Sequence, residues 1–295
     1  MKIIVTHDSP DMDAITSVWL IKKFLSGWDQ AMLKFVPAGE RFKNIKYQIS
    51  NIKNPIEEMG EDEVIHVDTG LGPLDHHQTA DEEISAASLT WDFIQDQRSK
   101  ISEREKTRDQ AVDRIVKVVV DIDHFKEVFW ENPTADHLEF SLVSILDGLK
   151  LQKPDQNNYY TEFISEALDA LLVEFENRIW AEEEIEKRGI EFETRNGRGM
   201  GFETVNDSVI KLAQKMGYVL VVRKDPRKGY VRIKARPESK VDLTLVFEKL
   251  SKMDPDATWF LHISKKMLLN GSVKNPKMRP TKLKLGDIIK VLEGL

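Results

Sequence analysis

The first part of the chain alternates short apolar runs with longer amphipathic segments. Residues 2–6 and 64–67 are rich in β-branched side chains and predict buried strands, and residues 32–37 predict another. Between the predicted strands at 2–6 and 32–37, apolar positions from 14 to 25 recur at helical spacing. Because strands that alternate with helices are typical of a parallel sheet, we expect an α/β fold with a parallel-sheet amino-terminal domain.

Helical spacing continues downstream. Residues 85–97, 106–120 and 137–150 each predict a helix, and residues 156–187 predict a long one that ends in an acidic run. The intervening segment 39–63 is polar, and we expect loops with short helical pieces there.

The last third of the chain predicts a second, smaller α/β domain. Its expected elements are a hairpin at 188–205, strands at 218–222, 230–235 and 259–263, and helices at 207–216, 242–252 and 286–293. We place the domain boundary after residue 187. Residues 1–187 then form the catalytic domain, with 156–187 as a connecting helix, and residues 188–295 form a basic substrate-binding domain.

Acids and imidazoles follow two of the predicted parallel strands. They are His7, Asp11 and Asp13 after the first strand, and Asp68, Asp75, His76 and His77 after the strand at 64–67. Open α/β sheets carry their chemistry at the carboxyl ends of strands, so these groups should meet at one edge. Imidazole and carboxylate suit Mn²⁺, Fe²⁺, Zn²⁺ and Mg²⁺. The pattern therefore predicts a site for two divalent cations, roughly 3.5–4 Å apart.

The same residues resemble a known family. His7-x3-Asp11-x-Asp13, Val67-Asp68-Thr69-Gly70 and Asp75-His76-His77 are similar to motifs I to III of the DHH phosphoesterase superfamily. That superfamily includes RecJ-type exonucleases, oligoribonucleases, cyclic-dinucleotide phosphodiesterases and family II pyrophosphatases. Asp75-His76-His77-Gln78 and Phe260-Leu261-His262 most resemble its DHH-like melanocyte proliferating gene branch, whose members are thought to be RNA exonucleases. The usual first motif of that branch differs from the Pro10-Asp11-Met12-Asp13 found here.

The resemblance implies how the ligands are divided. His7 and Asp11 would hold one metal ion, and Asp68 would bridge to a second. Asp13, His76 and Asp123 would hold the second ion. Asp123 matches the fourth motif, an aspartate that arrives after a helix, and Asp121 is the alternative. Mn²⁺ is the preferred ion and Mg²⁺ the alternative.

The remaining site residues have catalytic roles under the same resemblance. Asp68 would bridge the two ions, and the ion pair would lower the pKa of a bridging water to produce hydroxide near neutral pH. His77 would contact the scissile phosphate, and Asp75 would fix the orientation of an imidazole. His66 precedes Asp68 by two positions, so strand alternation predicts that it faces the same side and lines the site.

Charge is distributed unevenly along the chain. Residues 221–290 contain 18 Lys and Arg against 7 Asp and Glu, a local charge of +11 in a protein of net charge −7. Such a basic segment is expected to bind a phosphate-bearing ligand. The candidate contacts within it lie on the strand at 230–235, at the end of the strand at 259–263 and in the loop that follows. They are Arg232, Lys234, Arg236, His262, Asn270, Gly271 and Ser272.

These features favour a 3′–5′ exonuclease or oligoribonuclease that acts on single-stranded RNA, DNA or a nucleotide substrate. One alternative is a small-molecule phosphoesterase acting on a cyclic dinucleotide, a nucleotide phosphate or pyrophosphate. Another is a metal-binding regulatory protein without turnover. The chain has no cysteine, so nitrogen and oxygen must hold any metal. No apolar run approaches 18 residues, so we expect no membrane span and a cytoplasmic location. The sequence makes no prediction of oligomeric state.

Overall fold

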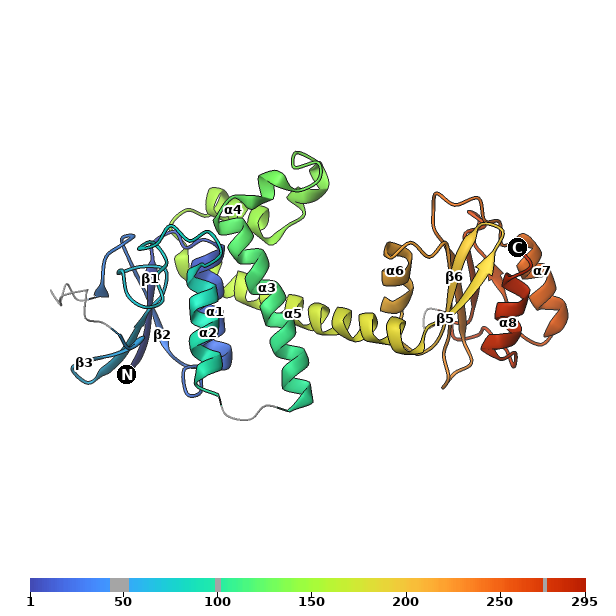
Figure 1. Cartoon of the computed structure of the whole chain (residues 1–295), viewed down its shortest axis with the longest axis horizontal. Helices are drawn as coiled ribbons and strands as arrows, with labels where there is room; N and C mark the ends of the chain where they lie inside the picture. The colour runs from blue at the N-terminus through green and yellow to red at the C-terminus, as the bar shows by residue number, and fades with distance from the viewer. Residues whose placement is uncertain (43–52, 99–101, 273–274) are drawn as a thin grey trace. The chain divides into compact units, whose positions relative to one another are not determined.

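The chain folds as two α/β units, which agrees with the predicted fold class (Figure 1). The computed structural model describes residues 1–42, 53–98, 102–272 and 275–295. The first unit comprises residues 1–176 and the second residues 177–295.

The sheet of the first unit has the strand order β2-β1-β4-β3. Its strands are β1 (Lys2–His7), β2 (Met32–Val36), β3 (Ile56–Met59) and β4 (Asp62–His66). β1 pairs in parallel with both β2 and β4, so the prediction of a parallel sheet is confirmed for these three strands. The register places Val5 opposite His66, and the N–H of Val67 donates to the Val5 carbonyl at 2.9 Å. The chain segments that follow β1 and β4 therefore leave the sheet at the same edge.

The prediction of loops and short helical pieces over residues 39–63 is wrong for its last part, and residues 43–52 lie outside the described residues. β3 pairs antiparallel with β4 across a turn at Gly60, whose φ is +71°. Glu57 and Glu58 interrupt the apolar pattern that would predict a strand here. The charges are tolerated because β3 lies at the edge of the sheet.

Polar caps start the helices of the first unit. The helices are α1 (Met12–Phe24), α2 (Ala86–Asp96), α3 (Glu103–Asp123), α4 (Leu142–Gln152) and α5 (Asn157–Arg188), with short 3₁₀ turns at Lys126–Phe129 and Asp136–Glu139. The side chains of Asp11, Ser85 and Ser102 accept backbone N–H groups at the starts of α1, α2 and α3. The helices α1 to α3 pack together beside the sheet (Figure 1). None of the helices in the described part of the chain is long and apolar enough to cross a membrane.

The predicted domain boundary after residue 187 differs from the observed division, which falls inside α5 between Glu176 and Asn177. The reason is packing. Ala181 and Ile185, on the last turns of α5, are buried in an apolar cluster with Met200 and Phe202 of the second unit. The end of the helix therefore belongs to the core of the second unit.

The second unit contains a six-stranded sheet of order β5-β6-β7-β8-β10-β9. Its strands are β5 (Ile190–Thr194), β6 (Gly197–Glu203), β7 (Leu220–Lys224), β8 (Val231–Ala235), β9 (Phe260–Leu261) and β10 (Met267–Asn270). Its helices are α6 (Ser208–Lys215), α7 (Thr244–Met253) and α8 (Leu285–Leu292). α6 and the end of α5 share one apolar cluster, and α7 and α8 share another on the opposite sheet face. β10 lies where no strand was predicted, in a stretch rich in lysine and leucine.

Asn270 and Gly271 are structural parts of this unit, which corrects their prediction as ligand contacts. The buried Asn270 amide donates to the carbonyls of Thr258 and Arg279 at 2.8 and 2.9 Å, and its oxygen accepts from Thr281 N–H at 2.8 Å. Gly271 has φ +80°, and a Cβ there would lie 1.9 Å from the Tyr230 ring. The amide closes the loop around β10, and the glycine makes room for the tyrosine.

We expect Gly271→Ala to destabilise the protein by about 2–4 kcal/mol, because Tyr230 must move and alanine is strained at positive φ. Chemical denaturation followed by circular dichroism measures the change. Gly286→Ala is the control, since a Cβ at that position would meet no heavy atom within 4 Å and the residue lies in the first turn of α8 without a positive φ. Equal stability of the two variants would contradict the steric role of Gly271.

Candidate metal centre

The first group of candidate ligands lies where β1 turns into α1. His7 is the last residue of β1, and Asp11 caps α1 by accepting the Ala14 N–H at 3.0 Å. The other Asp11 oxygen lies 3.8 Å from Nε2 of His7. The Nδ1 of His7 lies 2.8 Å from the Asp8 carbonyl, which can only accept, so Nδ1 carries the proton and Nε2 keeps its lone pair in the neutral ring.

Asp68 lies at the centre of the site because its backbone leaves the strand. β4 ends at His66, Asp68 has φ +53°, and its N–H donates to the Leu74 carbonyl at 3.0 Å. One carboxylate oxygen, Oδ2, lies 3.2 Å from His7 Nε2. The other, Oδ1, lies 3.7 Å from His76 Nδ1 and, among the described residues, has no hydrogen-bond partner although it is buried. The two oxygens of Asp68 thus serve two different groups of side chains.

Asp13 is fully buried and held at the start of α2. Its two oxygens accept the N–H groups of Ala86 and Ala87 at 2.7 and 2.8 Å, where the helix dipole favours a negative charge. Burial raises the pKa of Asp13 well above its ordinary range, and the carboxylates of Asp68 and Asp123 raise it further. Burial also raises the pKa of Asp68, with Asp11 adding to the effect against His7. Several carboxylates therefore lie close together in a buried part of the site, where a cation would stabilise their charged forms.

His76 links Asp13 to the end of α3. Its Nε2 lies 3.0 Å from Asp123, and its Nδ1 lies 3.5 Å from Asp13. Asp123 is the last residue of α3, and the alternative ligand Asp121 belongs to none of the potential metal-binding groups found in the described residues. Two positions on a helix point in different directions, so the fold brings one of the two aspartates to the site.

The nearby carboxylates raise the pKa values of the two histidines His7 and His76. Hydrogen bonding to Asp123 raises the pKa of His76 to about 9 against the effect of burial, with Asp13 and Asp68 assisting. Burial alone would lower the pKa of His7, but Asp68, the Asp8 carbonyl and Asp11 raise it to about 9. The imidazolium rings therefore supply part of the positive charge that the carboxylates require.

Three compact groups in the described residues have the composition of metal sites, with candidate ligand atoms within 4.8 Å of one another in each. Two of them consist of predicted metal ligands, namely His7, Asp11 and Asp68 in one and Asp13, His76 and Asp123 in the other. The third joins Asp68 and His76 with Asp75 and His77. Buried atoms without hydrogen-bond partners, Oδ1 of Asp68 and Nδ1 of His76, lie between the first two groups. Nitrogen and carboxylate oxygen in these numbers fit a divalent transition metal or Mg²⁺. The structure thus brings together all six of the predicted ligands.

Asp75 and His77 belong to the third group, which they share with Asp68 and His76. The buried Asp75 carboxylate accepts the N–H of Leu71 at 2.7 Å and lies 2.7 Å from Nδ1 of His77. The His77 side chain is 58% exposed, and its ring stacks on His76 with centroids 4.4 Å apart. Asp75 closes the loop and orients His77, whose Nε2 edge remains available to a ligand.

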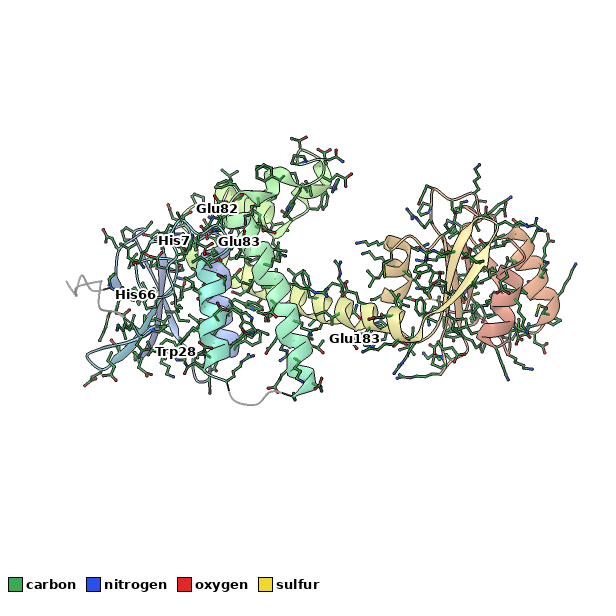
Figure 2. The ribbon with its side chains drawn as sticks, in the orientation of Figure 1. His7, Trp28, His66, Glu82, Glu83 and Glu183 are labelled. Atoms are coloured by element: carbon green, nitrogen blue, oxygen red, sulfur yellow. The ribbon has the colours of Figure 1, made fainter. Side chains whose placement is uncertain are left out.

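His66 does not line this site, which corrects the expectation from strand alternation. Its Nδ1 lies 3.0 Å from Glu57, and its Nε2 accepts the Phe42 N–H at 3.1 Å. It lies away from His7 within the first unit (Figure 2). Alternation fails because the left-handed backbone at Asp68 breaks the strand between the two residues.

Glu57 contacts both His66 and Arg41, an interaction that the sequence analysis did not predict. Arg41 pairs with Glu57 and donates to the Gly70 carbonyl at 2.8 Å. Thr69 accepts the Gly39 N–H and donates to the Glu40 carbonyl, both at 3.1 Å. This network ties the segment 39–42 to the backbone that follows Asp68. The role of Glu57 could not be predicted because no regular spacing in the sequence relates it to Arg41 or His66.

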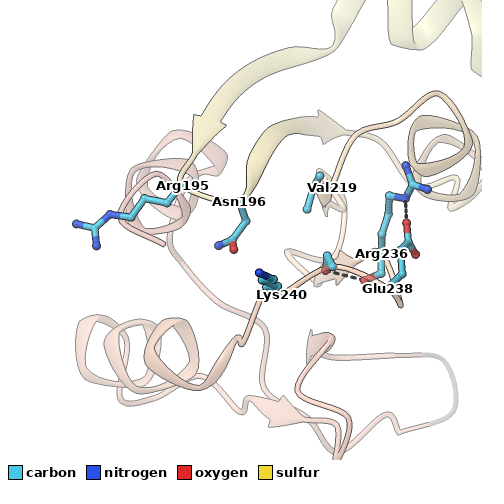
Figure 3. Close-up of a pocket in the computed structure, with 7 residues that line it drawn as sticks. Arg195, Asn196, Val219, Arg236, Glu238 and Lys240 are labelled. Atoms are coloured by element: carbon cyan, nitrogen blue, oxygen red, sulfur yellow. Dashed lines mark hydrogen bonds and ion pairs between the residues drawn. The ribbon is translucent and has the colours of Figure 1, made fainter.

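The predicted basic stripe of the second unit is partly neutralised. Arg232 and Lys234 share one face of β8, but Arg232 pairs with Asp207 and Arg236 pairs with Glu238. Arg236 and Lys240 line an open cavity of about 420 Å³ with Arg195, whose side chain points away from Arg236 (Figure 3). These cations do not converge on one point.

The other predicted contacts of the second unit form local turns. His262 Nδ1 lies 2.8 Å from the Ser264 hydroxyl, and Ser272 accepts the Asn275 N–H at 3.1 Å. His262 remains partly exposed, whereas the neighbouring Asn270 is buried. The structure therefore leaves Lys234 and His262 as the accessible members of the predicted set that have no ion-pair partner among the described residues.

Comparisons with known proteins do not assign a function to the site. No protein-family model matches the chain, and no curated protein matches it. A solved structure of an uncharacterized protein from Helicobacter pylori G27 is 13% identical, with 99% of each chain covered and a TM-score of 0.26. A TM-score this low carries no argument about fold or function.

We expect Glu57→Gln to destabilise the protein by about 3–5 kcal/mol at pH 7, because it leaves the nearly buried Arg41 without its charge partner. Burial opposes the shift, but His66 and Arg41 lower the pKa of Glu57 below its ordinary 4.5. A lowered pKa stabilises the fold above pH 4.5, and this contribution is lost as the pH falls through the folded-state pKa. The difference between wild type and variant should therefore shrink in acid.

Urea denaturation at pH 7 and at about pH 3.5 measures that difference. Glu58→Gln is the matched control, since Glu58 is the exposed neighbour on the same strand and should respond weakly at both pH values. A Glu57→Gln effect that is independent of pH would refute the charge-pair explanation.

Proposed function

We propose that this protein is a metal-dependent phosphodiesterase that hydrolyses the ends of nucleic acids or oligonucleotides with two divalent cations, Mn²⁺ first and Mg²⁺ as the alternative. One observation carries the proposal. The buried Asp68 directs one carboxylate oxygen to His7 and the other toward His76, so it lies between two complete ligand groups. A bridging carboxylate of this kind is what a two-metal hydrolase needs. The sequence resemblance to the DHH superfamily supports the same assignment.

Each residue then has a defined task. His7, Asp11 and Asp68 would hold one ion, and Asp13, His76 and Asp123 the other, with Asp68 shared. When bound, such a pair lowers the pKa of a water ligand and neutralises charge on the phosphate. His77, held by Asp75 through Nδ1, presents Nε2 to the substrate, and its protonated form donates to a phosphate oxygen.

Two features support a nucleic-acid substrate. The segment 221–290 carries the local charge of +11, which suits a polyanion. In addition, aromatic side chains are exposed shortly after the ligand Asp123, where Phe125, Phe129 and Phe140 are 72%, 85% and 93% exposed. Exposed rings of this kind are suited to stacking on unpaired bases.

A small-molecule phosphoesterase is the second candidate, because Arg232 and Arg236 are already paired with carboxylates. Fewer free cations then remain for a long phosphate backbone. The salt dependence of substrate binding separates the two candidates. An oligonucleotide should lose affinity steeply with added salt as counterions are released, whereas pyrophosphate or a cyclic dinucleotide should show a shallow dependence.

We expect Asp68→Asn and His76→Ala each to reduce phosphodiester hydrolysis at least about a hundredfold, because each removes a ligand worth several kcal/mol of transition-state stabilisation. The assay is Mn²⁺-supplemented turnover of short RNA and DNA, cyclic dinucleotides, nucleotide monophosphates and pyrophosphate. Asp121→Asn is the control, since Asp121 lies outside the ligand groups in the described residues. Wild-type activity in both ligand variants would refute the proposal, and Mn²⁺ uptake without any turnover would instead support a regulatory metal protein.

Phe125→Ala should raise the KM for a single-stranded oligonucleotide about 5- to 140-fold, since stacking on one base contributes about 1–3 kcal/mol. Hydrolysis of pyrophosphate, which has no base, should be unchanged. Steady-state kinetics on both substrates provide the measurement, with Phe163→Ala on α5 as a control for loss of an aromatic side chain elsewhere in the first unit. Equal effects of the two variants would argue against stacking at Phe125.

A further inference from the structure

The loop between His7 and Asp11 contains one residue, Ser9, in an infrequent backbone conformation. Ser9 has φ +52°, in the left-handed region that residues other than glycine adopt infrequently. Asp8 and Ser9 are exposed, and Pro10 is buried at the far end of the loop. Such a conformation persists only where surrounding contacts fix it. Because the flanking residues are two of the candidate ligands, what fixes this loop also fixes their positions.

The fixing contacts come from two helices far along the chain. The side-chain oxygen of Asn157 accepts the Ser9 N–H at 3.1 Å, and its amide nitrogen donates to the Asp8 carboxylate at 3.1 Å. Lys150 on α4 donates to the Ser9 carbonyl, also at 3.1 Å. Both polar groups of the Ser9 backbone are therefore bound by side chains that are more than 140 positions away.

Apolar packing does not replace these contacts. An open cavity of about 550 Å³ lies against the loop and is lined by Asp8, Ser9, Lys150 and Asn157, among others. The hydrogen bonds thus cross the edge of a solvent-accessible space. Asp8 is also the residue whose carbonyl accepts Nδ1–H of His7 at 2.8 Å, so the contacts of Asn157 reach the ligand ring through a single residue.

We propose that Asn157 and Lys150 are positioning residues that hold His7 and Asp11 in the geometry required for one of the two metal ions. The inference rests on the proposed function, since it concerns the same metal centre. Neither side chain touches the ligand atoms. They act through Asp8 and Ser9, as outer hydrogen bonds orient the ligands of metal sites in general. Asn157 suits this task because its amide both donates and accepts, and because it begins the long helix α5.

Calorimetric titration of Mn²⁺ alone into the metal-free full-length protein tests the inference. Wild type should bind two ions. In Asn157→Ala, one of the two sites should weaken about 10- to 100-fold while the other is unchanged. The reason is that Asn157 contacts Asp8 and Ser9, in the loop between His7 and Asp11, and no residue of the group Asp13, His76 and Asp123. Asn158→Ala, a change of the same type at the exposed neighbouring position, should leave both sites as in wild type.

Two further variants refine the test. Lys150→Met should weaken the same site, and Lys150→Arg should restore it in part, because arginine can still donate to the Ser9 carbonyl. Asn157→Asp should be at least as harmful as Asn157→Ala, since it cannot donate and places a second negative charge beside Asp8. Lys150→Met also keeps the inference testable if Asn157→Ala does not fold.

The ring signals of the histidines give a readout that needs no metal. In nitrogen–proton correlation spectra of the metal-free protein, Asn157→Ala should shift the His7 ring resonances and leave those of His76 in place. Unchanged His7 resonances together with two unchanged Mn²⁺ affinities would overturn the positioning role while leaving the proposed function intact. Failure of wild type to bind either Mn²⁺ or Mg²⁺ in the same titration would overturn both.

Discussion

The repulsion among three carboxylates is the constraint around which the first unit is built. Burial raises the pKa of Asp13 well above its ordinary range, and the nearby carboxylates of Asp68 and Asp123 raise it further. An arrangement of this kind is costly unless positive charge or N–H groups compensate it. The start of α2 does so for Asp13, and the imidazoles of His7 and His76 do so for the others. The same acidic and imidazole groups have the composition to hold cations.

Strand register turns this constraint into a site. The parallel pairing of β1 with β4 sets Val5 opposite His66, and the pairing continues through Val67. Two loops that are about 60 residues apart in sequence therefore begin side by side, and His7 and Asp68 meet at 3.2 Å. The helices complete the site from the outside. α2 binds Asp13 with its first N–H groups, and α3 delivers Asp123 from its last turn.

Local chemistry made much of this predictable from the sequence. Strands that end in His7 and just before Asp68 follow from apolar runs with polar ends. Because neighbouring parallel strands end at the same edge, the ligands His7, Asp11, Asp13, Asp68 and His76 could be expected to converge. Asp123 was assigned through the family resemblance alone, with Asp121 as the alternative. The exceptions share a cause, which is dependence on distant contacts. The edge strand β3 is hidden by its glutamates, the last turns of α5 join the second unit through Ala181 and Ile185, and Asn270 binds backbone groups of other loops. Periodicity carries no information about such partners.

The left-handed backbone of Asp68 has an implication for which sequences this fold can accept. Among residues with a side chain, asparagine, aspartate and histidine enter that region most readily, whereas longer and β-branched residues are strained there. Of these, aspartate alone offers two anionic oxygens. Glutamate would keep the charge but meet the backbone penalty, and asparagine would keep the backbone but lose the charge. A substitution at position 68 therefore loses either the favoured backbone conformation or the two anionic oxygens, so the backbone and the chemistry of the site restrict this position independently.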